Sequence, residues 1–136
     1  MTSLDLSPLE DALDQLEKGI LEAAKEPQSE LLRDGVIQRF EYSHELALKF
    51  IRRALETGFG ESVDPMMYNE VLRTAAEHGL IENVEAWFDY RTARNKTSHT
   101  YDAAVAEQVF LFAQPFLSDA QYLLDRLHAL KDRSSA

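Results

Sequence analysis

Apolar residues recur every three or four positions along almost the whole chain, which is the spacing of an amphipathic helix. The first run of this kind follows a helix start signal. Ser7 can cap the helix, Pro8 suits its first position, and Glu10 lies three residues after the cap. These features predict a helix over residues 8–25, and no window alternates regularly enough to predict a strand.

The longest periodic run predicts a second helix over residues 29–57, with Gly58 as its C-terminal stop. A helix of this length is typical of the spine of a helical bundle. Three further helices are expected: one over 65–78 opened by Asp64-Pro65, one over 84–94 capped by Asn83, and one from Ala103 capped by Asp102. Pro115 lies inside the last of these and should kink it or split it in two.

Together these elements predict an all-α, up-and-down bundle of four to five helices. The 136 residues fit one domain with a single core, and no internal repeat divides them. We expect the core of this domain to occupy residues 8–128, followed by a polar, flexible tail at 131–136.

The composition narrows the class of protein. A hydrophobic fraction of 45% is that of an ordinary globular chain. The absence of cysteine excludes disulfides and thiolate metal sites and is compatible with the cytoplasm, where we place the protein. No apolar stretch approaches the roughly 20 residues of a membrane span. The residues from Met1 to Asp5 lack a secretory signal. Because the sequence offers neither feature, we expect no membrane partner.

The formal net charge of −10 constrains any chemistry on nucleic acid. On average this surface should repel phosphates, because non-specific binding relies on Lys and Arg. Chemistry on RNA would therefore need a local basic pocket or the surface of a partner. An acidic surface also suits docking on a basic protein.

The segment from Arg94 to Tyr101 contains the most suggestive chemistry. Arg94 and His99 are five residues apart, and Asn95 follows the arginine directly. A guanidinium can bind a phosphate, and an imidazole can move a proton near neutral pH, which are the two groups that a metal-free ribonuclease needs most. The segment falls between two predicted helices, where free backbone N–H groups favour an anion. The same side chains could also lie on an ordinary solvated turn.

The second helix offers further polar candidates. Arg39, Glu41 and Glu45 could pair across a dimer or partner surface or lie on a solvated face, and Arg39 could form a cleft with the region of Arg94. Glu41 and Glu45 are like charges one turn apart, so we expect Arg or Lys from elsewhere to meet them. His44 lies on the apolar side of the helix and is expected to be a hydrogen-bonded core or interface residue.

The remaining patterns favour structural roles. His78 lies at a predicted helix end, where a cation suits the dipole, and His128 has no evident partner. The four histidines lack metal-ligand spacing, and no phosphate-binding glycine motif or nucleotidyltransferase signature occurs. We therefore predict no metal, no cofactor and no nucleotide transfer by this chain itself. The aromatic cluster of the fourth helix is expected in the core rather than as a base-stacking platform; it consists of Trp87, Phe88 and Tyr90.

Four blocks of sequence together resemble one known family. They are Arg33 to Tyr42, Glu45 to Lys49, Gly79 to Trp87, and Arg94 to Tyr101. Over about residues 8–128 they resemble the "nucleotidyltransferase substrate-binding protein" family of HEPN domains, which includes the HEPN toxins of HEPN–MNT toxin–antitoxin modules. The most specific element is Arg-x4-His-x-Tyr with Asn directly after the Arg, and it is present here without departure.

The resemblance implies a helical homodimer that brings two Arg-x4-His motifs to one cleft and cuts RNA, not DNA, without a metal. It also implies a partner, an MNT-type nucleotidyltransferase antitoxin, which can act by transferring AMP to the tyrosine of the motif. Carried over by position, Arg94 and His99 are the catalytic pair, with Asn95 as the supporting polar residue. Tyr101 is the corresponding modification site.

Three functions remain open at this stage. In the first, a toxin-type endoribonuclease, His99 acts as general base or acid at the ribose 2′-OH or the leaving oxygen, and Arg94 stabilises the phosphate charge. In the second, the chain is a non-catalytic subunit that presents a substrate or nucleotide to the nucleotidyltransferase, which the acidic charge favours. The third is a dimeric structural protein.

Overall fold

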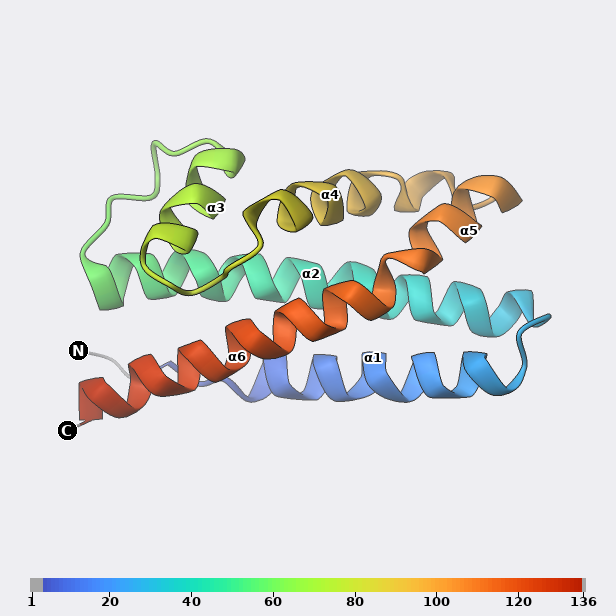
Figure 1. Cartoon of the computed structure of the whole chain (residues 1–136), viewed down its shortest axis with the longest axis horizontal. Helices are drawn as coiled ribbons and strands as arrows, with labels where there is room; N and C mark the ends of the chain where they lie inside the picture. The colour runs from blue at the N-terminus through green and yellow to red at the C-terminus, as the bar shows by residue number, and fades with distance from the viewer. Residues whose placement is uncertain (1–3, 136) are drawn as a thin grey trace.

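The computed structural model describes residues 4–135, in which the long helices run alternately in opposite directions along one axis (Figure 1). The elements are α1 (Ser7–Lys25), α2 (Glu30–Phe59), α3 (Tyr68–Glu77), α4 (Val84–Asn95), the 3-10 turn η1 (Thr97–His99), α5 (Ala103–Leu111) and α6 (Ala113–Ser135). No strand occurs in this part of the chain. The predicted all-α, up-and-down bundle is confirmed, with α5 and α6 as the two pieces of its last helix.

α2 is the spine of the bundle, since every other α-helix packs against it. The middle of the core is an aromatic cluster around Phe116 of α6. Its ring meets Phe40, Trp87 and Tyr90 edge-on, with centroids 5.2, 5.7 and 5.4 Å away. Trp87 and Tyr90 are buried and Phe88 is partly buried, so the expected core role of the α4 aromatics is confirmed. This packing fixes α4, which carries the first residues of the motif.

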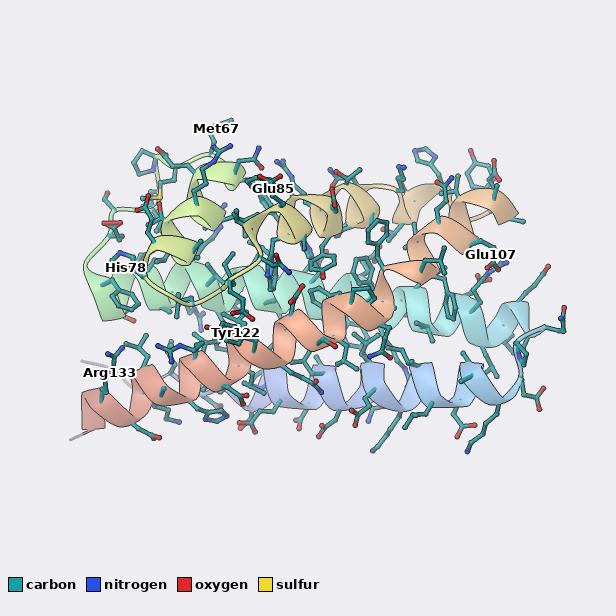
Figure 2. The ribbon with its side chains drawn as sticks, viewed as in Figure 1. Met67, His78, Glu85, Glu107, Tyr122 and Arg133 are labelled. Atoms are coloured by element: carbon teal, nitrogen blue, oxygen red, sulfur yellow. The ribbon has the colours of Figure 1, made fainter. Side chains whose placement is uncertain are left out.

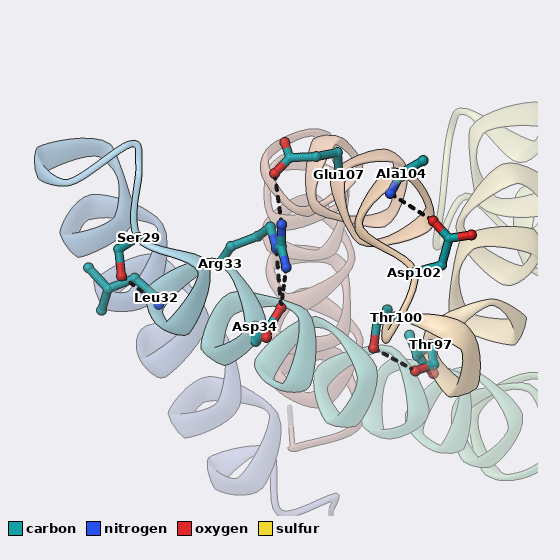
Figure 3. Close-up of polar contacts among 9 residues, drawn as sticks. All are labelled: Ser29, Leu32, Arg33, Asp34, Thr97, Thr100, Asp102, Ala104 and Glu107. Atoms are coloured by element: carbon teal, nitrogen blue, oxygen red, sulfur yellow. Dashed lines mark hydrogen bonds and ion pairs between the residues drawn. The ribbon is translucent and has the colours of Figure 1, made fainter.

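The starts of α1 and α2 are capped in different ways. At α1 the capping position is Leu6, and Ser7 is already helical and makes no side-chain cap. The backbone N–H of Ser7 instead donates to the carboxylate of Asp5 at 3.1 Å, so the prediction of a Ser7 cap is wrong. At α2 the hydroxyl of Ser29 accepts the N–H of Leu32 at 3.1 Å (Figure 3).

Gly60, and not Gly58, caps the C-terminus of α2, which corrects the predicted stop. Gly60 has a φ of 69°, a left-handed conformation that favours glycine. Gly58 lies inside the helix, and its lack of a side chain is explained by packing against α6. A Cβ at this position would lie 2.8 Å from Cδ2 of Leu130.

α3 begins at Tyr68, whereas the sequence predicted a start at residue 65. The N–H of Met66 bonds to the carbonyl of Val63 at 2.9 Å and closes a turn that contains Pro65. This turn buries Val63 against the core. The Asp64-Pro65 pair therefore initiates a turn, and the helix follows it.

The predicted break near Pro115 is confirmed. α5 ends at Leu111 and α6 begins at Ala113, so Pro115 lies in the first turn of α6. The N–H of a residue at that position has no partner within the helix, and proline is tolerated there.

The backbone of the expected tail is helical as far as Ser135, while Ala136 and residues 1–3 lie outside the described residues. Between residues 4 and 135, no helix combines the length and the apolar character that crossing a bilayer requires.

Candidate active site

The segment from Arg94 to Tyr101 forms a tight junction between α4 and α5. Arg94 and Asn95 occupy the last turn of α4, and His99 is the last residue of η1. The N–H of His99 donates to the carbonyl of Lys96 at 2.9 Å, and the carbonyl of His99 accepts the N–H of Asp102 at 3.1 Å. The backbone of His99 therefore closes the turns on either side of it. The predicted location between two helices is confirmed, although the connection is itself a short 3-10 helix.

Two glutamates of α2 hold the start of this junction. Arg94 forms an ion pair with Glu45, and both side chains stay partly open to solvent, at 32% and 58% exposure. One turn earlier on α2, Glu41 accepts a hydrogen bond from the hydroxyl of Thr97. The expectation that a cation from elsewhere meets the Glu41 and Glu45 pair is confirmed at Glu45.

Thr97 was missed by the sequence reasoning, yet it links the motif to α2. Besides its contact with Glu41, its hydroxyl lies 2.8 Å from the carbonyl oxygen of Arg94. Its own carbonyl accepts the hydroxyl of Thr100 at 3.1 Å (Figure 3). These bonds fix the backbone on which His99 is carried. The signal that could have found Thr97 is the run of hydroxyl side chains inside the motif.

An ion pair connects α5 to α2 just after the junction. The guanidinium of Arg33 contacts Glu107 on α5 and Asp34 on α2, each at 3.2 Å (Figure 3). Asp102 caps α5 as predicted, by accepting the N–H of Ala104 at 2.9 Å. Arg33 and Glu107 are 74 positions apart, so no local pattern could have paired them.

His99 and Tyr101 are the exposed end of the motif. Their rings meet edge-to-face with centroids 6.1 Å apart, and Tyr101 is 87% exposed. Histidine is the side chain that most readily exchanges a proton near neutral pH, and here a substrate can reach it. The phenol of Tyr101 is likewise open to the active site of another protein. Asn95 is also exposed, beside Arg94.

An open groove of about 490 Å³ begins at Arg94 and extends between α2, α3 and α4. Its lining consists of His44, Glu45, Leu48, Lys49, Arg52, Tyr68, Arg91, Arg94 and Asn95. Within the part of the chain that the structure describes, this lining holds four cationic side chains and one carboxylate. A local basic pocket, which an acidic chain needs in order to bind RNA, therefore lies directly beside the motif.

His44 and Tyr68 form the inner wall of this groove. The Tyr68 hydroxyl and Nε2 of His44 share a hydrogen bond of 2.9 Å. Burial, together with the charges of Arg94 and Arg91, lowers the pKa of His44 from 6.5 to about 4, so the ring is neutral at pH 7. Burial raises the pKa of Tyr68 against the opposing charge of Arg91. The expectation of a hydrogen-bonded core histidine is confirmed.

Arg39 is not brought to the site in this chain. Its Nη1 donates to the carbonyl of Gln15 on α1 at 2.6 Å, on a different side of α2 from Arg94. The suggested cleft between Arg39 and the Arg94 region does not form within one copy of the chain. The reason is helical periodicity, because Arg39 packs against α1, and Glu41 and Glu45 face the motif.

The other histidines lie away from the motif. His78 is toward one end of the bundle and Glu107, on α5 beyond the junction, is toward the other (Figure 2). His78 stacks on Phe59 with ring centroids 4.2 Å apart, in agreement with a structural role. His128 has its Nε2 2.7 Å from Glu10, so the expectation that it lacks a partner is wrong. No cluster of three or more potential metal ligands occurs within residues 4–135.

Comparison with protein families gives one match over nearly the whole chain. The family described as "Nucleotidyltransferase substrate binding protein like" matches residues 4–129. A protein of Haemophilus influenzae named "Probable ribonuclease HepT" is 34% identical to this chain in an alignment that covers 91% of this chain and 92% of that protein.

Solved structures share the fold. One, from Haemophilus influenzae, is described as revealing the fold of a substrate binding domain of a nucleotidyltransferase. It superposes with a TM-score of 0.83 at 31% identity, over 91% of this chain and 99% of that one. A second, from Thermus thermophilus, gives a TM-score of 0.77 at 29% identity, over 88% and 98% of the two chains.

Proposed function

This chain belongs to the nucleotidyltransferase substrate binding protein family, and we propose that it is a toxin-type endoribonuclease that cuts RNA without a metal ion. The relative named "Probable ribonuclease HepT" supports this activity. The observation that carries the proposal is the junction between α4 and α5, which presents Arg94 and an exposed His99 on one short, hydrogen-bonded stretch of backbone. A purely structural turn has no chemical need for that pair.

In the proposed reaction, Arg94 binds the scissile phosphate and stabilises the charge that builds on it in the transition state. His99 takes the proton of the ribose 2′-OH or delivers one to the leaving oxygen. Asn95, exposed beside the arginine, orients the phosphate. Two copies of the chain form a homodimer in which the second His99 supplies the complementary proton transfer.

The proposed partner is a small nucleotidyltransferase antitoxin, with both proteins acting in the cytoplasm. It neutralises the toxin by transferring AMP from ATP to Tyr101. The phenol oxygen attacks the α-phosphorus, pyrophosphate leaves, and the phenol proton passes to a base. The 87% exposure of Tyr101 supports this step, since the hydroxyl can enter another active site without unfolding of the junction. The added phosphate would compete with RNA for Arg94.

Two observations favour a second function, a non-catalytic subunit that presents substrate to the nucleotidyltransferase. Glu45 already neutralises Arg94 in the free chain, and the net charge of −10 disfavours RNA. In that case the motif would bind a nucleotide and cut nothing.

Expression of the chain without its partner tests the proposal. Wild type, His99→Ala and His128→Ala would be induced separately, with growth and RNA integrity as readouts. His128→Ala is the matched control, because it removes a histidine that pairs with Glu10 on another part of the bundle.

Growth arrest with RNA cleavage in the wild type and His128→Ala, absent from His99→Ala, supports the ribonuclease. Soluble, folded wild-type protein that causes neither effect would support the binding subunit instead. Purified protein assayed with excess chelator then tests the requirement for a metal.

A further inference from the structure

The groove beside the motif carries positive charge in two rows. On α2, Lys49 and Arg52 are three residues apart and share one face of the helix. On α4, Arg91 and Arg94 have the same spacing and line the same groove from the other side. α2 and α4 run in opposite directions (Figure 1), so the rows continue away from His99 together.

The three arginines of the groove converge on its inner wall. The guanidinium of Arg91 lies over the ring of Tyr68, 4.1 Å from its centroid. The hydrogen bond between Tyr68 and His44 holds that ring in place, so Arg91 has a preorganised support. Arg91, Arg52 and Arg94 all lie close enough to Tyr68 to favour a negative charge on it.

This concentration of charge is unusual for the chain. The sequence has 24 acidic residues against 14 Lys and Arg, yet among the described residues the groove is lined by four cations and by Glu45. Glu45 is already engaged by Arg94, which leaves Lys49, Arg52 and Arg91 to act on a ligand. An anion is therefore drawn to this groove while the rest of the surface repels it.

We propose that the groove between α2, α3 and α4 binds the backbone phosphates of single-stranded RNA that flank the phosphate at Arg94. The inference rests on the proposed ribonuclease function and names the path of its substrate. The distance along α2 from Glu45 to Arg52 is about 10 Å, seven residues at the helical rise, which leaves room for a phosphate beyond the one at Arg94. Phosphates on this path bind Arg91 and Lys49 first, and then Arg52 farther from Arg94.

The test is direct binding of an oligoribonucleotide with 2′-O-methyl groups throughout, which this chemistry cannot cut. The proteins are the full-length chain and its double variant Lys49→Gln/Arg52→Gln. The matched control is Lys18→Gln/Arg53→Gln, which changes net charge equally at exposed positions outside the groove. Each Kd is measured over a series of salt concentrations, and circular dichroism checks that every variant is folded.

The groove variant should bind roughly tenfold more weakly near physiological salt, and its slope of log K against log salt should be smaller by about 1.4, or 0.7 for each lost contact with a single strand. The control should match the wild type. Equal Kd values for the two double variants, or no RNA binding by the wild type, would overturn the proposal.

Cleavage of an unmodified RNA by the same proteins separates the two claims. Cleavage together with equal Kd values refutes the groove and leaves the ribonuclease intact. Groove-dependent binding without cleavage refutes the ribonuclease and leaves the groove. If the groove variant loses binding to a partner protein but not to RNA, the groove is a protein-docking surface and the proposal is wrong.

Discussion

Arg94, the proposed phosphate ligand, forms an ion pair with Glu45 from the neighbouring helix. The carboxylate therefore occupies a guanidinium that an incoming phosphate needs, and it also sets the direction in which that guanidinium points. Because both side chains are partly exposed, the pair adds little to folding stability. Its consequence lies in ligand binding.

Replacing Glu45 with Gln should tighten RNA binding. The amide keeps a hydrogen-bond acceptor for Arg94 but removes the competing charge, so the Kd for a non-cleavable RNA should fall roughly two- to fivefold, the equivalent of an exposed ion pair. Glu85→Gln, which makes the same charge change at an exposed position on α4, is the control. Equal tightening in both variants would show that only the net charge matters.

The hydroxyl of Thr97 positions the backbone that carries His99, through its contacts with Glu41 and with the carbonyl of Arg94. Thr97→Val keeps the shape and removes the hydroxyl, which should lower stability by about 1 kcal/mol and kcat by a larger factor than KM rises. Thr97→Ser should retain activity. The idea fails if Thr97→Val unfolds at a lower temperature but cleaves RNA with unchanged kcat.

Neutral, buried His44 makes folding stability depend on pH. Its pKa is about 4 in the folded protein, against an ordinary value of 6.5 for the solvated side chain of the unfolded chain. Below pH 6.5 the unfolded chain therefore binds more protons, and stability falls until pH 4. Between pH 8 and pH 5, the titration of this histidine should lower the free energy of unfolding by about 2 kcal/mol. Urea unfolding at both values should show that loss in the wild type and much less of it in His44→Gln, which can still bond to Tyr68. An equal loss in both proteins would assign it to other groups.

What could be predicted from the sequence is what local periodicity determines. The span of α1 and the break at Pro115 follow from the spacing of apolar residues and from the chemistry of proline. Gly58 misled the prediction because a helix stop and a close helix contact call for the same residue. A neighbour from α6, distant in sequence, decided between the two.

In the candidate site too, local features could be predicted from the sequence, and contacts between distant residues could not. The motif from Arg94 to Tyr101 is contiguous, so its position at a helix junction was predictable. The like charges of Glu41 and Glu45 implied a cation, but its identity depended on Arg94, 49 positions from Glu45. The basic groove requires three helices to meet, which no single stretch of sequence records. The dimer, which involves a second copy, stays a prediction.

Gly35, inside α2, and Gly60, which caps the C-terminus of α2, should respond to alanine with opposite changes in stability. Gly35 lies within the helix, and a Cβ there meets nothing within 4 Å, so Gly35→Ala should raise the free energy of unfolding by about 1 kcal/mol. Gly60 is equally open but has a φ of 69°, so Gly60→Ala should lower it by about 1 kcal/mol. Denaturant titration of both variants measures these changes in the free energy of unfolding. The same sign in both would contradict the assigned end of α2.

Tyr101 is the residue on which the proposed control by the partner depends. Its 87% exposure makes its hydroxyl available, and Tyr101→Phe removes that hydroxyl while keeping the ring contact with His99. Incubation with ATP and the proposed nucleotidyltransferase partner should add AMP to the wild type and to the control Tyr122→Phe, but not to Tyr101→Phe, as read by intact mass. Tyr101→Phe should then remain toxic in the presence of the partner. AMP on a different residue, or full neutralisation of Tyr101→Phe, would mean that the partner acts by binding alone or at another site.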